Sequence, residues 1–196
     1  MMHLLVSCVF AAAAGPNLLT NPNFGEAMTG WEVQAESAEV ARAAPEGPLA
    51  LHLSVPPEKL VGYPRVLQRF TCAPEAVYEA RVLAKGVDVR DGYGAYMTLE
   101  FVDGAGKRIN FFQGSAAEPD GTWSEIGVRG VAPPEAAKSM ICCVLNGHGN
   151  AWFREASVTL TVTDQRPCAR FLGFGFEDDG WLYNPMNAEH GVDAAG

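Results

Sequence analysis

The feature that most constrains the fold of this chain is a series of short runs in which apolar and polar residues alternate, each closed by Gly or Pro. The clearest run covers residues 95–102. Its two faces differ: Ala95, Met97, Leu99 and Phe101 lie on one, and Tyr96, Thr98 and Glu100 lie on the other. A period of two is the pattern of a β-strand with one buried face. We therefore expect the first set to be buried and the second to face a groove or solvent.

Similar runs recur along the chain and predict an all-β fold. We expect further strands at residues 50–55, 66–72, 77–85, 107–113, 123–131, 139–146 and 151–162. The sequence Asp103-Gly104-Ala105-Gly106 predicts a hairpin turn between two of these runs. The stretch 135–138 is too short for a helix and follows two prolines, which favours a loop. Turns at this spacing are typical of a β-sandwich or a barrel.

The composition allows a hydrophobic core and argues against a polyanionic partner. Of the 196 residues, 48% are hydrophobic, which argues against a disordered chain. The formal net charge of -9 repels phosphate backbones. The sequence has no long run of Lys and Arg to bind an anionic membrane surface. We expect a protein that neither binds nucleic acid nor inserts into a membrane, and we expect it to be a monomer.

The two ends of the sequence differ from its middle. Residues 4–14 form a short apolar run that ends in small alanine residues directly before Gly15, which is typical of a signal peptide and its cleavage site. The run is too short to span a membrane. Residues 1–14 therefore predict bacterial export, to the exterior or to the cell surface. The strand pattern stops after residue 163, where residues 164–170 resemble a linker and residues 171–196 begin a segment rich in Gly and Phe.

The five cysteines leave two interpretations open. Cys8 falls within the predicted signal peptide, and the other four match no zinc-binding spacing: Cys72, Cys142, Cys143 and Cys168. Adjacent Cys142 and Cys143 should point to opposite faces of one strand. In an exported protein one disulfide can form, with a pairing that the sequence does not fix. Alternatively, these residues are small buried hydrophobes.

A motif near the start of the predicted mature chain reads Asn-Leu-Leu-Thr-Asn-Pro-Asn-Phe over residues 17–24, and Gly30-Trp31 follows. Further pieces come later in the chain: Gln68-Arg69-Phe70, Tyr78, Leu99 to Asp103 with Gly106-Lys107, Trp123, Pro133-Pro134 and Trp152-Phe153. In this order they resemble a cenC-type carbohydrate-binding module. The resemblance implies that residues 15–163 form a jelly-roll β-sandwich of the galactose-binding-like type. It also implies non-catalytic binding of an extracellular polysaccharide or oligosaccharide, with aromatic side chains stacked on sugar rings.

The C-terminal segment suggests alternatives. Residues 171–196 resemble the truncated start of a glycoside-hydrolase domain. The chain could therefore be the N-terminal fragment of a glycoside hydrolase, or else an adhesion or interaction domain that has no sugar site. We expect no catalytic residues in this chain. The adjacent acids Glu177, Asp178 and Asp179 are consecutive in sequence, so they cannot flank a glycosidic bond across a cleft.

Six residues are candidates for contact with a sugar: Tyr96, Glu100, Arg81, Asn110, Phe112 and Trp152. A Tyr, an acid, an Arg and an Asn on one outward sheet face could stack on a sugar and bind its hydroxyls. The alternative is an ordinary solvated face, because antiparallel sheets commonly have one wet side. Further candidates in loops or at edges are Tyr63, Tyr93 and His148. Core packing is expected for Trp31, Tyr78, Ala80, Val82, Phe101, Trp123 and Phe153.

The resemblance also implies a structural calcium ion as a possible cofactor, since acidic residues hold one in many family members. Glu26 and Glu155 lie near the corresponding positions and are the candidate metal ligands. However, Gly25 separates Glu26 from the Phe of the opening motif, and Arg154 stands where an acid is usual. We therefore expect weak calcium binding or none, and no other cofactor.

Overall fold

The computed structural model describes residues 15–44 and 47–161, which form eight β-strands. The strands are β1 (Glu32–Gln34), β2 (Glu39–Ala43), β3 (Ala50–Val55), β4 (Arg65–Thr71), β5 (Val77–Val102), β6 (Arg108–Gln113), β7 (Ser124–Val131) and β8 (Lys138–Thr161). The described residues contain no helix, and hence no helix that could cross a membrane. The predicted signal peptide, linker and C-terminal segment lie outside the described residues, as do Cys8 and Cys168.

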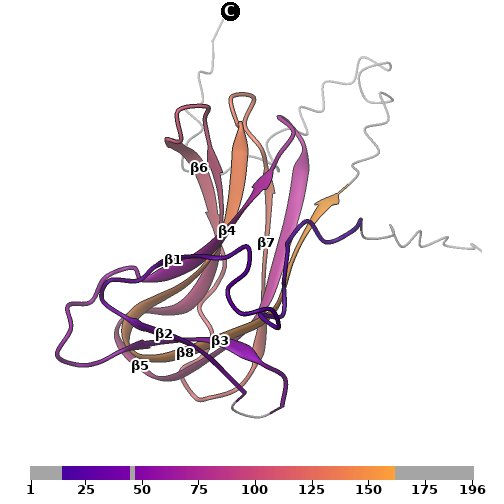
Figure 1. The fold of residues 1–196 in the computed structure, drawn as a ribbon. Coiled ribbons are helices and arrows are strands. Elements are labelled where there is room, and N and C mark those ends of the chain that lie inside the picture. The colour runs from indigo at the N-terminus through magenta and orange to yellow at the C-terminus, as the bar shows by residue number, and fades with distance from the viewer. Residues whose placement is uncertain (1–14, 45–46, 162–196) are drawn as a thin grey trace, which may run out of the picture.

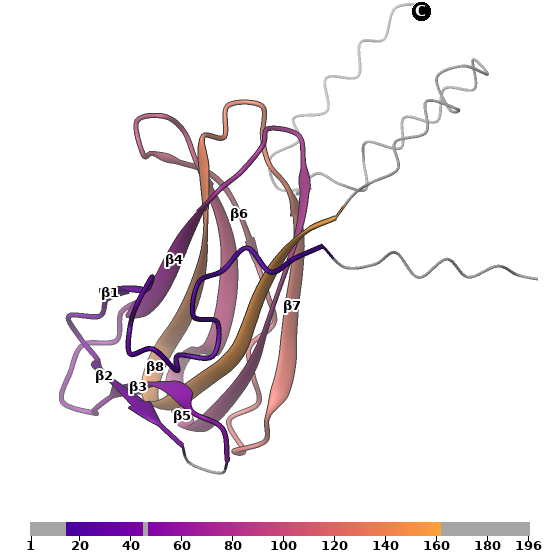
Figure 2. The ribbon, with the colours of Figure 1, turned by 45° about the vertical axis from the view of Figure 1, so that its right-hand side comes forward.

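Two long strands, β5 and β8, pair antiparallel along almost their whole length and build both layers of the molecule (Figures 1 and 2). The second half of β5 and the first half of β8 continue into β6 on one side and into β4 and β1 on the other. We call this layer sheet 1, with the order β1-β4-β8-β5-β6. The remaining halves continue into β7 and into β3 and β2. We call this layer sheet 2, with the order β2-β3-β8-β5-β7.

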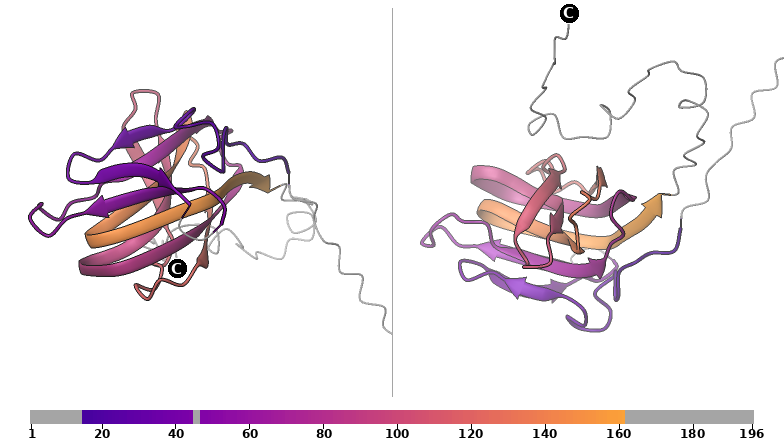
Figure 3. Two further views of the ribbon diagram at one scale, coloured as in Figure 1. Left: turned by 60° about the horizontal axis from the view of Figure 1, so that its bottom comes forward. Right: turned by 90° about the horizontal axis from the view of Figure 1, so that it is seen from above.

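Glycines allow β5 and β8 to bend from one sheet into the other at the same end of the sandwich (Figure 3). Gly147 and Gly149 have φ angles of 125° and 120°, which residues with a side chain rarely adopt. A Cβ atom on Gly147 would lie 2.6 Å from the carbonyl oxygen of Arg90, and one on Gly149 would lie 2.6 Å from that of Asp88. The two backbones can therefore approach this closely only where side chains are absent.

This bend corrects the strand boundaries expected from the sequence. The alternation predicts separate strands at 77–85 and 95–102, and again at 139–146 and 151–162, but the structure has only β5 and β8 over these residues. The prediction of a break is wrong because the glycines bend the backbone while the β5–β8 pairing resumes on both sides, with register shifts between Val87 and Gly94.

The core lies between the two sheets and confirms most of the predicted burial. Met97, Leu99 and Phe101 are fully buried. The core predictions also hold for Trp31, Tyr78, Ala80, Val82 and Phe153. Cys143 joins this core while Cys142 lies on the opposite face of β8, as adjacent strand residues should. The three described cysteines are buried and unpaired with one another, which fits their interpretation as small hydrophobes.

The motif near the N-terminus has a structural role. The Gln68 side chain accepts a hydrogen bond from the Thr20 amide at 2.6 Å and donates one to the Thr20 carbonyl at 2.8 Å. The indole nitrogen of Trp31 donates to the Asn21 carbonyl at 3.0 Å. The rings of Phe24 and Trp31 lie 4.7 Å apart, and both are buried. The motif thus attaches the N-terminal segment to the sandwich.

We expect Gly147→Ala to lower the free energy of unfolding by about 2 kcal/mol or more, because it combines an unfavourable φ with a backbone clash. The matched control is Gly104→Ala in the 103–106 hairpin turn, where an added Cβ would meet nothing within 4 Å. That variant should change stability by less than about 0.5 kcal/mol. Urea unfolding measures both, and equal losses would contradict the role assigned to the bend.

Candidate functional site

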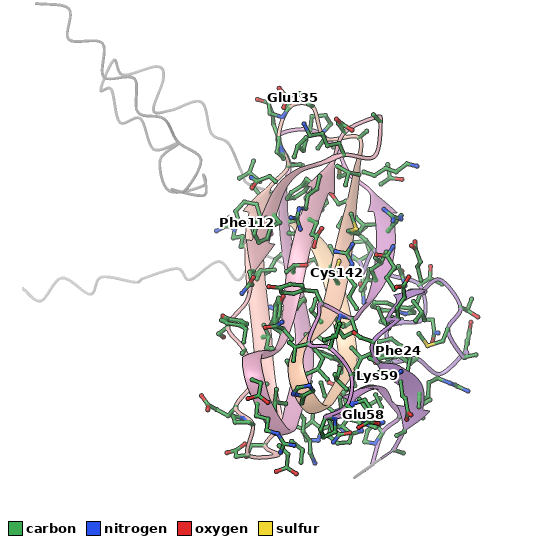
Figure 4. The ribbon with its side chains drawn as sticks, turned by 90° about the vertical axis from the view of Figure 1, so that its left-hand side faces the viewer. Phe24, Glu58, Lys59, Phe112, Glu135 and Cys142 are labelled. Atoms are coloured by element: carbon green, nitrogen blue, oxygen red, sulfur yellow. The ribbon has the colours of Figure 1, made fainter. Side chains whose placement is uncertain are left out.

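The outer face of sheet 1 carries a second, smaller cluster of buried residues. Its members come from β4, β5 and β8: Leu67, Tyr96, Val102, Met140, Cys142 and Val144. Exposed aromatic and cationic side chains surround these buried residues. We call the following set the tyrosine–arginine face: Tyr63, Arg65, Tyr93, Tyr96, Glu100, Arg108 and Phe111. Figure 4 shows Cys142 midway along the sandwich, between Glu135 at one end and Glu58 and Lys59 at the other.

Three tyrosines of the face form one aromatic group. The ring of Tyr93 meets the ring of Tyr96 edge-on, with centroids 5.1 Å apart. Tyr96 is buried, whereas Tyr63 is 70% exposed and Tyr93 is 51% exposed. Burial, followed by the nearby Tyr63 and Glu100, raises the pKa of Tyr96 to about 12. The Tyr96 hydroxyl therefore stays protonated at neutral pH. The exposed rings of Tyr63 and Tyr93 are the ones that can contact a ligand.

A buried carboxylate organises the charged part of the face. Glu100 accepts a hydrogen bond from the Thr98 hydroxyl at 2.9 Å. Arg65 of β4 approaches its carboxylate to 3.4 Å and Arg108 of β6 approaches it to 3.5 Å. Two guanidinium groups around one carboxylate leave a local charge of +1. This charge makes the face a good hydrogen-bond donor toward oxygen atoms of a ligand.

Neighbouring groups also orient both arginines. The Nε atom of Arg65 donates to the Gln34 side chain at 3.0 Å. The guanidinium of Arg108 lies over the Phe111 ring, 4.8 Å from its centroid. A planar guanidinium that is held on one side can present its remaining N–H groups as a fixed fork.

The Cys142 thiol beneath this face is unreactive. Burial raises its pKa to about 12, so this group is neither a nucleophile nor a metal ligand at neutral pH.

The structure divides the six predicted sugar-contact residues among three places. Tyr96 and Glu100 share the tyrosine–arginine face, although both are buried rather than open to a groove or solvent. Arg81 lies on the outer face of sheet 2, where it pairs with Glu125 at 2.6 Å. Trp152 lies on that same face, stacked on His52 with ring centroids 4.5 Å apart. The predicted set does not form one site.

Phe112 and Asn110 are not on the outward face that the alternation predicts. Phe112 pairs with Leu99 in register and packs against the core. Asn110 pairs with Phe101, a core residue, so the position of Asn110 is also on the core side of the sheet. The predicted orientation is wrong because the register shifts between Phe101 and Val102, which pairs with Arg108. Such a shift exchanges the two faces of a strand.

Trp123 is also placed differently from the prediction. It is half-buried on the outer face of sheet 2, where the Arg154 guanidinium lies 4.0 Å from its ring centroid. The sequence interpretation also missed Arg65, Arg108 and Phe111. Arg65 lies two residues before Leu67 on β4, so the two side chains share one face of the strand. This spacing is a signal for Arg65, but its use requires the pairing of β4 with β8.

The described residues do not fit a calcium ion at the place that the family resemblance implies. Glu26 and Glu155 are both exposed, and the described residues contain no group of three or more His, Cys, Asp or Glu that could hold a metal. Instead, the Arg42 guanidinium donates to the Phe24 carbonyl at 3.0 Å. Glu155 faces Arg154, at 3.6 Å. Calcium needs six to eight oxygen ligands, whereas here protein cations contact the oxygens concerned.

No protein-family model and no curated protein matches the sequence. The CBM22-1 xylan-binding domain of Xyn10C from Paenibacillus barcinonensis matches in structure with a TM-score of 0.56 and 21% identity, over 76% of this chain and 97% of that domain. The family 16 carbohydrate-binding module-2 matches with a TM-score of 0.52 and 15% identity, over 72% of this chain and 99% of that module. The chain has the fold of these carbohydrate-binding modules. The predicted β-sandwich of this type is confirmed.

Larger proteins contain a similar fold. The enzymatically active domain of tailspike protein 4 from bacteriophage CBA120 matches with a TM-score of 0.60 and 18% identity, over 74% of this chain. The α-L-arabinofuranosidase MgGH51 matches with a TM-score of 0.56 and 17% identity, over 80% of this chain. The match spans 21% of the tailspike chain and 28% of the arabinofuranosidase chain. At these identities the similarity shows the fold.

We expect Arg42→Met to lower the free energy of unfolding by about 1 kcal/mol, because the Phe24 carbonyl loses its charged donor. The melting temperature of the unmodified chain should be the same with added calcium and with a chelator. Thermal unfolding under both conditions measures this. A melting temperature that rises with calcium and falls with the chelator would show that the N-terminal loop binds the ion after all.

Proposed function

We propose that this chain binds polysaccharides or oligosaccharides, without catalysis, on the tyrosine–arginine face. The observation that supports this best is the combination of two exposed rings, Tyr63 and Tyr93, with two guanidinium groups held around Glu100. The fold shared with carbohydrate-binding modules raises its plausibility, although a fold alone does not fix a function.

The chemistry of a sugar suits both parts of this face. The C–H groups of a pyranose ring form an apolar surface that stacks on an aromatic ring. Its hydroxyl groups accept hydrogen bonds from guanidinium N–H groups. Because each of these hydrogen bonds replaces one made with water, its net contribution is small. We therefore expect dissociation constants in roughly the micromolar to millimolar range.

The charged groups of the face support binding rather than hydrolysis. Hydrolysis of a glycosidic bond generally needs two carboxyl groups about 5 to 10 Å apart, one of them able to donate a proton. Glu100 is buried, and Arg65 and Arg108 both pair with its carboxylate. Glu32, on the edge strand β1, pairs with Arg69 at 3.3 Å, and its pKa is lowered mainly by the Gln34 side chain. Glu32 is therefore not suited to donate a proton at neutral pH, and among the described residues Glu100 has no second carboxylate paired with it across a cleft.

An extracellular location would bring the chain to such polymers. The predicted signal peptide at residues 1–14 supports export. Attachment to a glycoside hydrolase is a second possibility that the match to MgGH51 favours, since the matching region covers only part of that enzyme. In that arrangement the binding face would hold the polymer near a separate catalytic domain. We propose that the described domain itself acts as a monomer.

We expect Tyr63→Ala and Tyr93→Ala each to weaken saccharide binding by roughly 5- to 20-fold, the loss of one aromatic contact worth about 1–2 kcal/mol. Because both rings are exposed, the melting temperature should change little. Affinity electrophoresis in gels containing xylan, galactan or arabinan measures retardation, and calorimetry with the corresponding oligosaccharides gives the affinity.

Arg108→Gln should also weaken binding, whereas Arg81→Gln is the matched control on the outer face of sheet 2. Trp152→Ala tests the alternative location directly. Loss of binding in the Trp152 variant, with full binding in the Tyr63 and Tyr93 variants, would place the sugar on sheet 2. If none of the polysaccharides retards the unmodified chain, the adhesion or interaction alternative replaces this proposal.

A further inference from the structure

Two side chains of β8, Asn146 and His148, each connect the same two segments of the chain. One segment is the loop 56–64 between β3 and β4, which carries Tyr63. The other is the bend of β5 at residues 88–94, which carries Tyr93. The two side chains lie two residues apart, next to the glycines that allow β5 and β8 to bend. Figure 4 shows Glu58 and Lys59 of the loop at this end of the sandwich.

Asn146 holds both segments through its amide group. Its Nδ2 atom donates to the Gly62 carbonyl at 2.8 Å, and its Oδ1 atom accepts from the Tyr93 amide at 2.7 Å. The orientation of the amide is fixed, because a backbone carbonyl can only accept and a backbone N–H can only donate. Gly62 directly precedes Tyr63. The Asn146 side chain therefore sets the separation of the backbones that carry the two exposed rings.

His148 makes the second connection between the same segments. Its Nε2 atom lies 3.0 Å from the Lys59 carbonyl, and its Nδ1 atom lies 3.0 Å from the Asp91 carboxylate. Both partners are acceptors, so only the protonated imidazole can donate to both at once. In the neutral ring one nitrogen carries no hydrogen, and its lone pair must then face one of the two oxygens. Loss of the proton thus removes one of the two contacts.

Packing within the loop does not replace these contacts. Leu60 is 89% exposed and Tyr63 is 70% exposed. A segment with little buried apolar surface depends on its hydrogen bonds for a fixed position. Ring position matters for stacking because a sugar must meet both aromatic faces in a single pose.

We propose that Asn146 and His148 form a clamp that positions Tyr63 and Tyr93 for saccharide binding, and that protonation of His148 tightens this clamp. The proposal rests on the proposed function of the tyrosine–arginine face and adds its positioning residues and its regulation. In this arrangement Asn146 acts at every pH, whereas His148 makes the position of the loop, and with it the affinity, depend on pH. Binding is then stronger in mild acid than in mild base.

The charges around His148 support this direction. The hydrogen bond to the Lys59 carbonyl and then the Asp91 carboxylate raise the pKa of His148 above its ordinary value of 6.5, while Arg90 opposes the shift. Arg90 also approaches Asp91, at 3.9 Å. The other charged residues of the two segments are Asp88, Glu58 and the Lys59 ammonium group. With a raised pKa, the second contact is fully present below pH 6.5 and is lost as the pH rises through the folded-state pKa.

The test follows two properties of the full chain between mild acid and mild base. The first is the affinity for xylan, galactan and arabinan, and the second is the protection of backbone amides against hydrogen exchange, corrected for the intrinsic rate at each pH. The informative amides are those of Tyr93, bonded to Asn146, and Lys59, bonded to the Pro56 carbonyl at 3.1 Å. We expect protection of the Lys59 amide and saccharide affinity to fall together as His148 loses its proton. The affinity should fall by roughly two- to fivefold, as for one exposed ion pair.

Three variants separate the parts of the clamp. His148→Gln should show the lower affinity of the unmodified chain at high pH, with no further pH dependence. Asn146→Ala should lose affinity and protection of the Tyr93 amide at every pH while it keeps the pH dependence. His52→Gln is the matched control, since His52 is the other described histidine and lies on sheet 2. It should behave like the unmodified chain.

Specific outcomes would overturn the proposal. If the affinity of His148→Gln still depends on pH, another group titrates at the site. Full affinity and full Tyr93 amide protection in Asn146→Ala would show that the clamp does not position the rings. If no polysaccharide binds at any pH while Lys59 protection still follows the His148 proton, the proposed function fails. The clamp then remains as a feature of the fold without the role in binding that we assign to it.

Discussion

The antiparallel ladder between β5 and β8 is the interaction on which the rest of the structure depends. It runs from the Val77–Thr161 pair to the Val102–Lys138 pair, and every other strand except β1 and β2 attaches directly to it. Because the ladder bends at glycines, one pair of strands supplies the centre of both sheets. The hydrophobic core then forms between two halves of the same ladder. The bend also brings the Tyr93 segment of β5 beside Asn146 and His148 of β8, so the geometry of the fold determines the geometry of the candidate site.

The strict alternation of a strand gives the same residues two tasks. On β5, Leu99 packs into the core while its neighbour Glu100 lies under the tyrosine–arginine face. Burial of a carboxylate is costly unless ion pairs and hydrogen bonds compensate the lost hydration. Here Arg65, Arg108 and Thr98 provide that compensation. The arrangement keeps the arginines in place. Glu100 therefore acts on a ligand through the orientation of Arg65 and Arg108.

The sequence predicts the local pattern of the strands well and their connections poorly. Alternation predicted the bounds of β3 and the opposite faces of Leu99 and Tyr96, because both depend only on neighbours along the chain. It missed β1 and β2, whose residues are mostly exposed and carry no apolar period. It placed Phe112 on the wrong face because the register shift opposite Phe101 comes from pairing between strands. The site residues Arg65 and Arg108 come from the two strands that flank the β5–β8 centre, so only the pairing of the strands brings them to Glu100.

The candidate site combines buried residues of the sheet with exposed rings beside them, and this division has a consequence for specificity. Tyr96 and Glu100 are buried in the sheet, so they cannot by themselves enclose a ligand. The rings that a sugar would contact, Tyr63 and Tyr93, lie outside the regular part of the ladder, and their positions depend on contacts made by two β8 side chains. A residue that lies on a surface loop, as Tyr63 does, can vary without loss of the fold. Changes in the 56–64 loop should therefore alter which saccharide is accepted, while changes at the buried residues Tyr96 and Glu100 should alter whether the domain folds.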